Sequence, residues 1–278
     1  MPVERVTKEL LERELTSQRF LAGLEKAIEI SVDTKREACF DVEKELFGEQ
    51  IVYPSVIHIG DETHCGELHA LSYALSRYRK SLEAAGRKWI EPRSPEFDTV
   101  DFYAFCAVNR LLHENYPEFP KECSQKKDSI WDFYTFLMLH THPSTYRSST
   151  HPNPYLLPSF DDLTTLNSFR RELKHLGIYP KPVMVIASIE NNDRYQELLF
   201  LQEKVKRPIK GKKLKELIKE VDEFLDPKVQ LIKGILGVKE KQYCNKGIGY
   251  FDRSNGEISF DFDLEDFAYS VEAGGKDE

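Results

Sequence analysis

The run WDFYTFLML, residues 131–139, restricts the fold more than any other feature of the sequence. Its apolar and aromatic residues are almost unbroken, and the run has the length of a strand. A strand that is apolar at nearly every position is covered on both faces. The run leads directly into His140. We therefore expect a buried strand whose end carries a histidine.

Segments on both sides of this run predict alternating helices and strands. Apolar residues at helical spacing between Lys8 and Ile30 predict one or two amphipathic helices, and a further helix is expected from Ser159 to about Leu176. Other segments predict strands at residues 37–42, 50–59, 182–188 and 195–202, and a hairpin with an Asn255-Gly256 turn over residues 250–262. The expected fold class is α/β, with a mixed, curved sheet flanked by helices.

Charge and hydropathy argue against two classes of partner. The 278 residues carry a formal net charge of -8, which disfavours wholesale binding to nucleic acid, because neutralising phosphates requires a basic face. No apolar run approaches the roughly 20 residues that span a bilayer, and the N-terminus is charged where a signal peptide is apolar. We expect a cytoplasmic protein with no nucleic-acid or membrane partner. The sequence leaves its oligomeric state open.

Two further patterns have structural interpretations. Residues 204–224 are rich in lysine with a helical pattern, which is typical of a solvated surface, and a docking arm for an acidic partner is the alternative. The five cysteines are an odd number without a C-x-x-C pair. We therefore expect reduced, mostly buried thiols rather than a disulfide framework or a zinc ribbon.

The residues that carry chemistry lie between positions 139 and 163. His140 and His142 are two apart at the end of the expected strand, so period-two alternation directs both imidazoles to the same side. Imidazole nitrogen suits zinc, whose catalytic sites take three protein ligands and leave a fourth position open. Asp162 supplies a third ligand if the loop folds back, because it lies in the first turn of the helix expected from Ser159. The alternative is that Ser159 and Asp162 form only a helix capping box.

The segments His140-Thr141-His142-Pro143 and Pro158-Ser159-Phe160-Asp161-Asp162-Leu163 together resemble the H-x-H-P and S-x-x-D signature of the JAMM (JAB/MPN) metalloprotease family. The joint pattern is fairly specific, because its halves stand at a strand end and a helix start. The resemblance covers about half of the chain, residues 8–60 and 128–202 and, more faintly, 246–264. It implies one JAB/MPN-like domain over residues 1–264, with a helical insertion at about 64–127, a second insertion (a Lys-rich helix and a strand) at about 203–243, and a flexible tail at 265–278.

The resemblance also implies a role for each residue of the pattern. His140, His142 and Asp162 bind Zn²⁺, and Ser159 hydrogen-bonds the oxyanion of the tetrahedral intermediate. A glutamate on an early strand activates the attacking water. Glu37 is the best candidate, because REACFDV follows the first helix and its alternation places Glu37, Cys39 and Asp41 on one face. Glu43, Glu45 and Glu67 are rival candidates, and Glu37 as an ordinary surface residue is a further alternative.

Two departures from the family pattern concern access to the site. The loop of residues 144–158 is longer than the family's usual spacing, and it contains His151, which either touches the metal or substrate or is an exposed loop histidine. The helical insertion contains His64, Cys65 and His69. We expect them to be ordinary residues, and a second metal site is the less favoured alternative.

The function implied by the resemblance is a zinc-dependent peptidase or isopeptidase. Its substrate is an amide bond at the C-terminal tail of a ubiquitin-like protein or its conjugates. One alternative is a zinc amidase or peptidase acting on another amide, such as the processing of a sulfur-carrier protein. The other is a non-catalytic scaffold of the MPN type.

Overall fold

The computed structural model describes residues 3–60, 133–143, 180–189, 194–204, 212–225 and 244–272, with the single positions 84, 86, 158, 162, 163, 166, 232 and 235. Three of the expectations lie largely outside these residues. They are the helical insertion at about 64–127, the loop 144–158, and most of the helix from Ser159 to Leu176.

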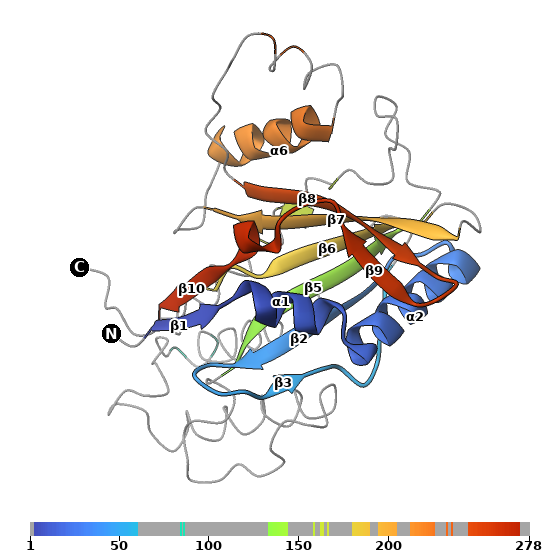
Figure 1. The fold of residues 1–278 in the computed structure, drawn as a ribbon, viewed down its shortest axis with the longest axis horizontal. Coiled ribbons are helices and arrows are strands. Elements are labelled where there is room, and N and C mark those ends of the chain that lie inside the picture. Colours follow the sequence, from blue (N-terminus) through green and yellow to red (C-terminus); the bar gives the residue numbers. More distant parts are fainter. Residues whose placement is uncertain are drawn as a thin grey trace.

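A mixed, twisted sheet forms the centre of the fold (Figure 1). In the described ranges it has eight strands in the order β3-β2-β5-β6-β7-β8-β9, with β4 also paired to β2. β5 and β6 are parallel, and the other neighbours are antiparallel. The predicted α/β class and mixed sheet are confirmed. The strands are β2 (Ala38–Glu45), β3 (Ile51–Val52), β4 (His58–Ile59), β5 (Phe133–His142), β6 (Val183–Ser188), β7 (Tyr195–Glu203), β8 (Cys244–Asp252) and β9 (Glu257–Phe260).

β5 is the buried strand that the apolar run predicts. It lies between β2 and β6, and each of its residues from Phe133 to His142 is buried. The hydrogen-bonded ladders on both sides satisfy its backbone groups, so the strand can lie deep in the sheet without an unpaired polar main chain. The strand extends three residues beyond the apolar run. Both histidines are therefore strand residues held by the sheet.

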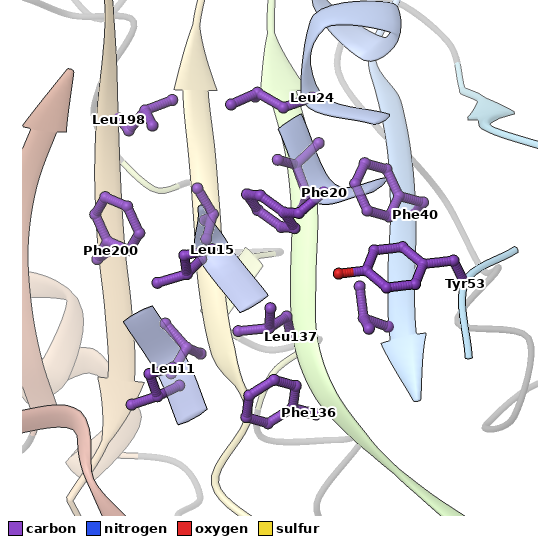
Figure 2. Close-up of a cluster of buried hydrophobic side chains, with 14 of the residues drawn as sticks. Leu11, Leu15, Phe20, Leu24, Phe40, Tyr53, Phe136, Leu137, Leu198 and Phe200 are labelled. Carbon is purple, nitrogen blue, oxygen red and sulfur yellow. The ribbon is translucent and has the colours of Figure 1, made fainter. Parts of the chain in front are cut away.

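Two helices, α1 (Lys8–Leu15) and α2 (Gln18–Thr34), cover one face of the sheet, as the helical spacing of apolar residues predicts. Each begins after a capping hydroxyl, from Thr7 and Ser17, that accepts a hydrogen bond from a main-chain amide of the first turn. Figure 2 shows the core that they form with the strands. Its side chains include Leu11, Leu15, Phe20 and Leu24 from the helices and Phe40, Leu137, Leu198 and Phe200 from the sheet.

A third helix, α6 (Lys212–Leu225), lies within the lysine-rich segment and confirms its helical prediction. Lys212 and Lys219 are exposed, but Glu220 is buried and its carboxylate lies 3.5 Å from Lys246 Nζ on β8. One side of this helix is therefore anchored to the sheet by an ion pair. None of the helices in the described ranges has the length and apolar character to cross a bilayer.

The two ends of the described chain pair with each other, which corrects the expected flexible tail at 265–278 over residues 265–272. β1 (Val3–Val6) and β10 (Tyr269–Glu272) form a two-stranded antiparallel sheet. A short 3-10 helix, η2 (Leu264–Phe267), comes directly before β10. Phe267 and Val271 are almost fully buried. These apolar side chains hold the segment against the core, so at least residues 265–272 belong to the domain.

The predicted hairpin is confirmed. β8 and β9 are joined by a turn in which Gly256 has a φ of 71°, a left-handed conformation that glycine adopts at little cost. Asp252 pairs with Glu257, so the loop has four residues, Arg253 to Gly256, instead of the two-residue turn that an Asn-Gly pair favours.

The cysteines differ in part from the expectation of reduced thiols. Cys39 carries a disulfide bond, which the odd count and the spacing of cysteines gave no reason to expect. Cys244 is a free thiol, as expected, and burial raises its pKa to about 12. A thiol with so high a pKa is unreactive at neutral pH.

Candidate metal centre

His140 and His142 stand on the same face of β5, at its C-terminal end. Their exposed fractions are 7% and 0%, and their Nε2 atoms lie 3.1 Å apart. In the pairing of the sheet, His140 lies opposite Cys39 of β2 and Ile186 of β6. The backbone of both neighbours thus fixes the direction of the imidazoles, as the two-residue spacing predicts.

Asp162 completes a group of three side chains. Its Oδ1 lies 3.1 Å from His140 Nε2, and its Oδ2 lies 3.2 Å from His142 Nε2. The residue is helical, and Leu163 and Leu166, which are also helical, are each 1% exposed. The chain therefore returns to the end of β5 after twenty residues, and the three side chains could hold one metal ion.

The charges at this group favour a cation. Burial works to raise the pKa of Asp162, but the charges of His140 and His142 and their hydrogen bonds hold it well below its usual value. Burial, the largest single influence, likewise works to lower the pKa of His140, but the charge and hydrogen bond of Asp162 together with the charges of Glu37 and Asp41 outweigh it and raise the pKa. Three carboxylates therefore stabilise positive charge at this point, and a divalent ion meets that demand.

Glu37 lies beside this group. It comes directly before β2, it is 2% exposed, and its charge contributes to the raised pKa of His140. Continuing the β2 and β5 pairing by two residues from Cys39 and His140 places it opposite His142. Its carbonyl accepts a hydrogen bond of 2.8 Å from the Gly60 amide. The structure therefore brings Glu37 to the three candidate ligands.

The rival glutamates lie elsewhere. Glu43 pairs with Thr135, which is five residues before His140 and so about 15 Å away along the strand. Glu45 pairs with Phe133, farther still from the histidines. Glu67 lies outside the described residues.

Glu43 is nevertheless unusual. It is fully buried, its Oε1 accepts a hydrogen bond of 2.8 Å from Thr135, and its Oε2 has no hydrogen-bond partner among the residues that the structure describes. Burial, together with the charge of Asp41, raises its pKa well above the ordinary value. These properties describe a carboxyl group that holds its proton, not a base beside the histidines.

Other predicted site residues fall outside the part of the chain that the structure describes. They are Ser159, His151 and the residues of the possible second site, His64, Cys65 and His69. The roles expected for them stay predictions.

Two features of the site were not predicted from the sequence. Asp41 is buried and its charge acts on His140, although its place on the Glu37 face was foreseeable from alternation. Thr141, between the histidines, turns to the opposite face and bonds with Ser31. The alternation gives the direction of Thr141, but no local pattern identifies a partner 110 residues away.

Comparison with known proteins adds no family to this description. No family model, curated protein or solved structure matches the chain. The geometry of the three ligands and Glu37 is therefore the basis for any functional conclusion.

Proposed function

We propose that the chain is a zinc-dependent hydrolase of the JAMM type that cleaves an amide bond. The observation that carries the proposal is the convergence of His140, His142 and Asp162 at the end of a buried strand, with Glu37 beside them. The order of the elements supports it. The elements follow one another along the chain as the resemblance implies. Their order is α2, then β2 with its short partners, β5 with the two histidines, the helical Asp162 and β6.

The donor atoms have suitable spacing for zinc. Bonds of about 2.0–2.1 Å to a tetrahedral zinc ion place neighbouring ligand atoms about 3.3 Å apart. Here the two imidazole Nε2 atoms lie 3.1 Å apart, and they lie 3.1 and 3.2 Å from Oδ1 and Oδ2 of Asp162, respectively. Two imidazoles and one carboxylate are also a ligand set typical of catalytic zinc, which retains an open position. When bound, the ion supplies a Lewis acid and lowers the pKa of a water to about 7.

The chain's own residues supply the proton transfers. Glu37 is in position to accept a proton from the attacking water and to deliver it to the amide nitrogen that leaves. Ser159 is proposed to donate a hydrogen bond to the oxyanion that forms on the carbonyl. The assignment of Ser159 depends on the sequence pattern alone.

We propose the C-terminal tail of a ubiquitin-like protein, or its conjugates, as the substrate, because the resemblance implies it. Another amide, such as the tail of a sulfur-carrier protein, is the second candidate. The cytoplasm is the proposed location. The disulfide at Cys39 is an observation against this location, because disulfides persist mainly in oxidising compartments. Labelling of thiols in freshly lysed cells tests the redox state of Cys39.

The function is tested by incubating the zinc-loaded protein with ubiquitin-like conjugates and with precursors that carry extended tails. We expect cleavage that a chelator abolishes and zinc restores, and that His142→Ala and Asp162→Asn lack. Asp33→Asn, the same chemical change at an exposed position of α2, is the matched control and retains cleavage. Zinc binding without cleavage of any substrate would instead favour the non-catalytic scaffold.

A further inference from the structure

Behind the metal centre, two buried hydroxyl groups connect α2 to the end of β5. Ser31 lies in the last turn of α2 and Thr141 lies between the two histidines, and both are 0% exposed. Their hydroxyl oxygens are hydrogen-bonded to each other. Thr141 faces the α2 side of the sheet, because its neighbours on β5 face the metal side.

The remaining hydrogen bonds of this pair go to the residues on either side of Glu37. Ser31 Oγ donates to the Arg36 carbonyl at 2.6 Å, and the Ala38 amide donates to Thr141 Oγ1 at 2.9 Å. Each hydroxyl has one proton. Since the proton of Ser31 is used on Arg36, Thr141 donates to Ser31, and the Ala38 carbonyl is a second, longer acceptor for Thr141 at 3.4 Å. A single directed chain then runs from the Ala38 amide through Thr141 and Ser31 to the Arg36 carbonyl.

This chain of hydrogen bonds encloses the main chain of Glu37. The carbonyl of Glu37 itself is held from the β4 side by the Gly60 amide. The segment from Arg36 to Ala38, between the end of α2 and the start of β2, is thus fixed at three successive points.

Apolar packing alone does not explain why residues 31 and 141 carry hydroxyl groups. The same face of the sheet is apolar, with Ala38, Leu139 and Ala187 in the core, and Ala187 is the β6 neighbour of Thr141. Valine at 141 and alanine at 31 would fit such an apolar site. A buried hydroxyl that makes no hydrogen bond costs about 1–3 kcal/mol, and these two side chains have no hydroxyl to bury. The hydroxyls are directed only to one another and to the neighbours of Glu37.

We propose that Ser31 and Thr141 are positioning residues that set the Glu37 carboxylate relative to His140 and His142. This inference rests on the proposed function, because it takes Glu37 as the base. Thr141 suits the role because it lies between the two ligands at the end of β5. His140 and His142 are directed from one face of this strand end, and Thr141, on the other face, fixes the main chain around Glu37. A displacement of about 1 Å at a reacting group can lower a rate about 100-fold.

The test compares Thr141→Val, which keeps the shape and removes the hydroxyl, with Thr141→Ser, which keeps the hydroxyl. We expect Thr141→Val to lower kcat by about 10- to 100-fold with KM and zinc stoichiometry unchanged, and Thr141→Ser to stay within about threefold of the parent. In a Glu37→Gln background, Thr141→Val should have no further effect on the rate, because the two residues act as one unit. An equal loss in both backgrounds, or unchanged kcat in Thr141→Val, overturns the proposal.

A second readout does not depend on hydrolysis. We expect protein loaded with Co²⁺ to have a visible spectrum that changes with pH, and Thr141→Val to shift the midpoint of this change in the same direction as Glu37→Gln. Thr141→Ser should leave it in place, and Ser31→Ala serves if Thr141→Val does not fold. A Co²⁺ spectrum insensitive to the hydroxyls contradicts the positioning role. If the parent hydrolyses no substrate but the shift is present, the proposed function fails and the positioning role stands.

Discussion

The Nε2 atoms of His140 and His142 lie 3.1 Å apart, and each also lies within 3.2 Å of a carboxylate oxygen of Asp162. Two protonated imidazoles at this separation repel each other strongly, since little water is present to screen them. A divalent ion among the three side chains removes that conflict, because both imidazoles then present a lone pair to one positive charge. The geometry thus explains why the pair is buried beside a helix that supplies an anion.

Glu37→Gln separates the proposed base from the metal ligands. The amide cannot accept the proton of the attacking water, so we expect kcat to fall by about 100- to 10,000-fold while zinc stoichiometry stays at the parental value. Glu45→Gln is the matched control, because Glu45 ends β2, the strand that Glu37 precedes, but pairs with Phe133, far from the histidines. Steady-state kinetics and metal analysis of both variants decide the assignment. A Glu37→Gln protein with parental kcat excludes Glu37 as the base.

Glu43→Gln is expected to stabilise the protein, and more so at alkaline pH. The folded-state pKa of Glu43 is raised, mainly by burial, so the native state holds the proton more tightly than the unfolded chain. The stability from this group is therefore full at pH values below the unfolded pKa and is lost as the pH rises through the folded value. Glutamine does not ionise, and we expect a gain in Tm of at least about 2 °C at pH 8 and a smaller one at pH 5.

Thermal unfolding at both pH values checks this expectation, with Glu12→Gln on the exposed side of α1 as the control. The interpretation of Glu43 as a protonated, buried carboxyl group is wrong if the variant loses stability equally at both pH values.

Glu4→Gln tests how β1 is attached to the main sheet. The Glu4 carboxylate pairs with Lys44 of β2 and accepts hydrogen bonds from the Tyr134 hydroxyl and the Phe47 amide, and Glu4, Lys44 and Tyr134 are buried. Removing its charge leaves the buried Lys44 ammonium, which also contacts the carbonyls of Glu45 and Gly48, without this carboxylate partner. We expect a loss of about 3–5 kcal/mol in the free energy of unfolding by denaturant. A loss below about 1 kcal/mol, similar to that of Glu12→Gln, contradicts a buried ionic anchor.

Much of the fold was predictable because the relevant patterns are local. The helical spacing before Ile30, the apolar run before His140 and the Asn255-Gly256 turn each report the burial of nearby side chains. The two-residue spacing likewise directs His140 and His142 to one face. Asp162 is different. Its approach to the histidines depends on the path of the chain after β5, and only the resemblance of the sequence motif indicated it.

The features that the sequence did not predict depend on contacts between distant segments. β1 and β10 are four residues each and pair across nearly the whole chain, so neither is a recognisable strand by itself. The charged pattern of Asp41, Glu43 and Lys44 predicts solvent exposure, yet all three are buried because both faces of β2 are covered. The bond between Ser31 and Thr141 joins a helix end to a strand end in the same way.

The most direct test of the metal centre is the zinc content of the purified protein after saturation with zinc and removal of the excess. The parent is expected to retain one zinc per chain, His142→Ala and Asp162→Asn none, and the exposed Asp33→Asn one. A parent that retains no zinc, or an Asp162→Asn protein that retains as much as the parent, would contradict a site built from His140, His142 and Asp162.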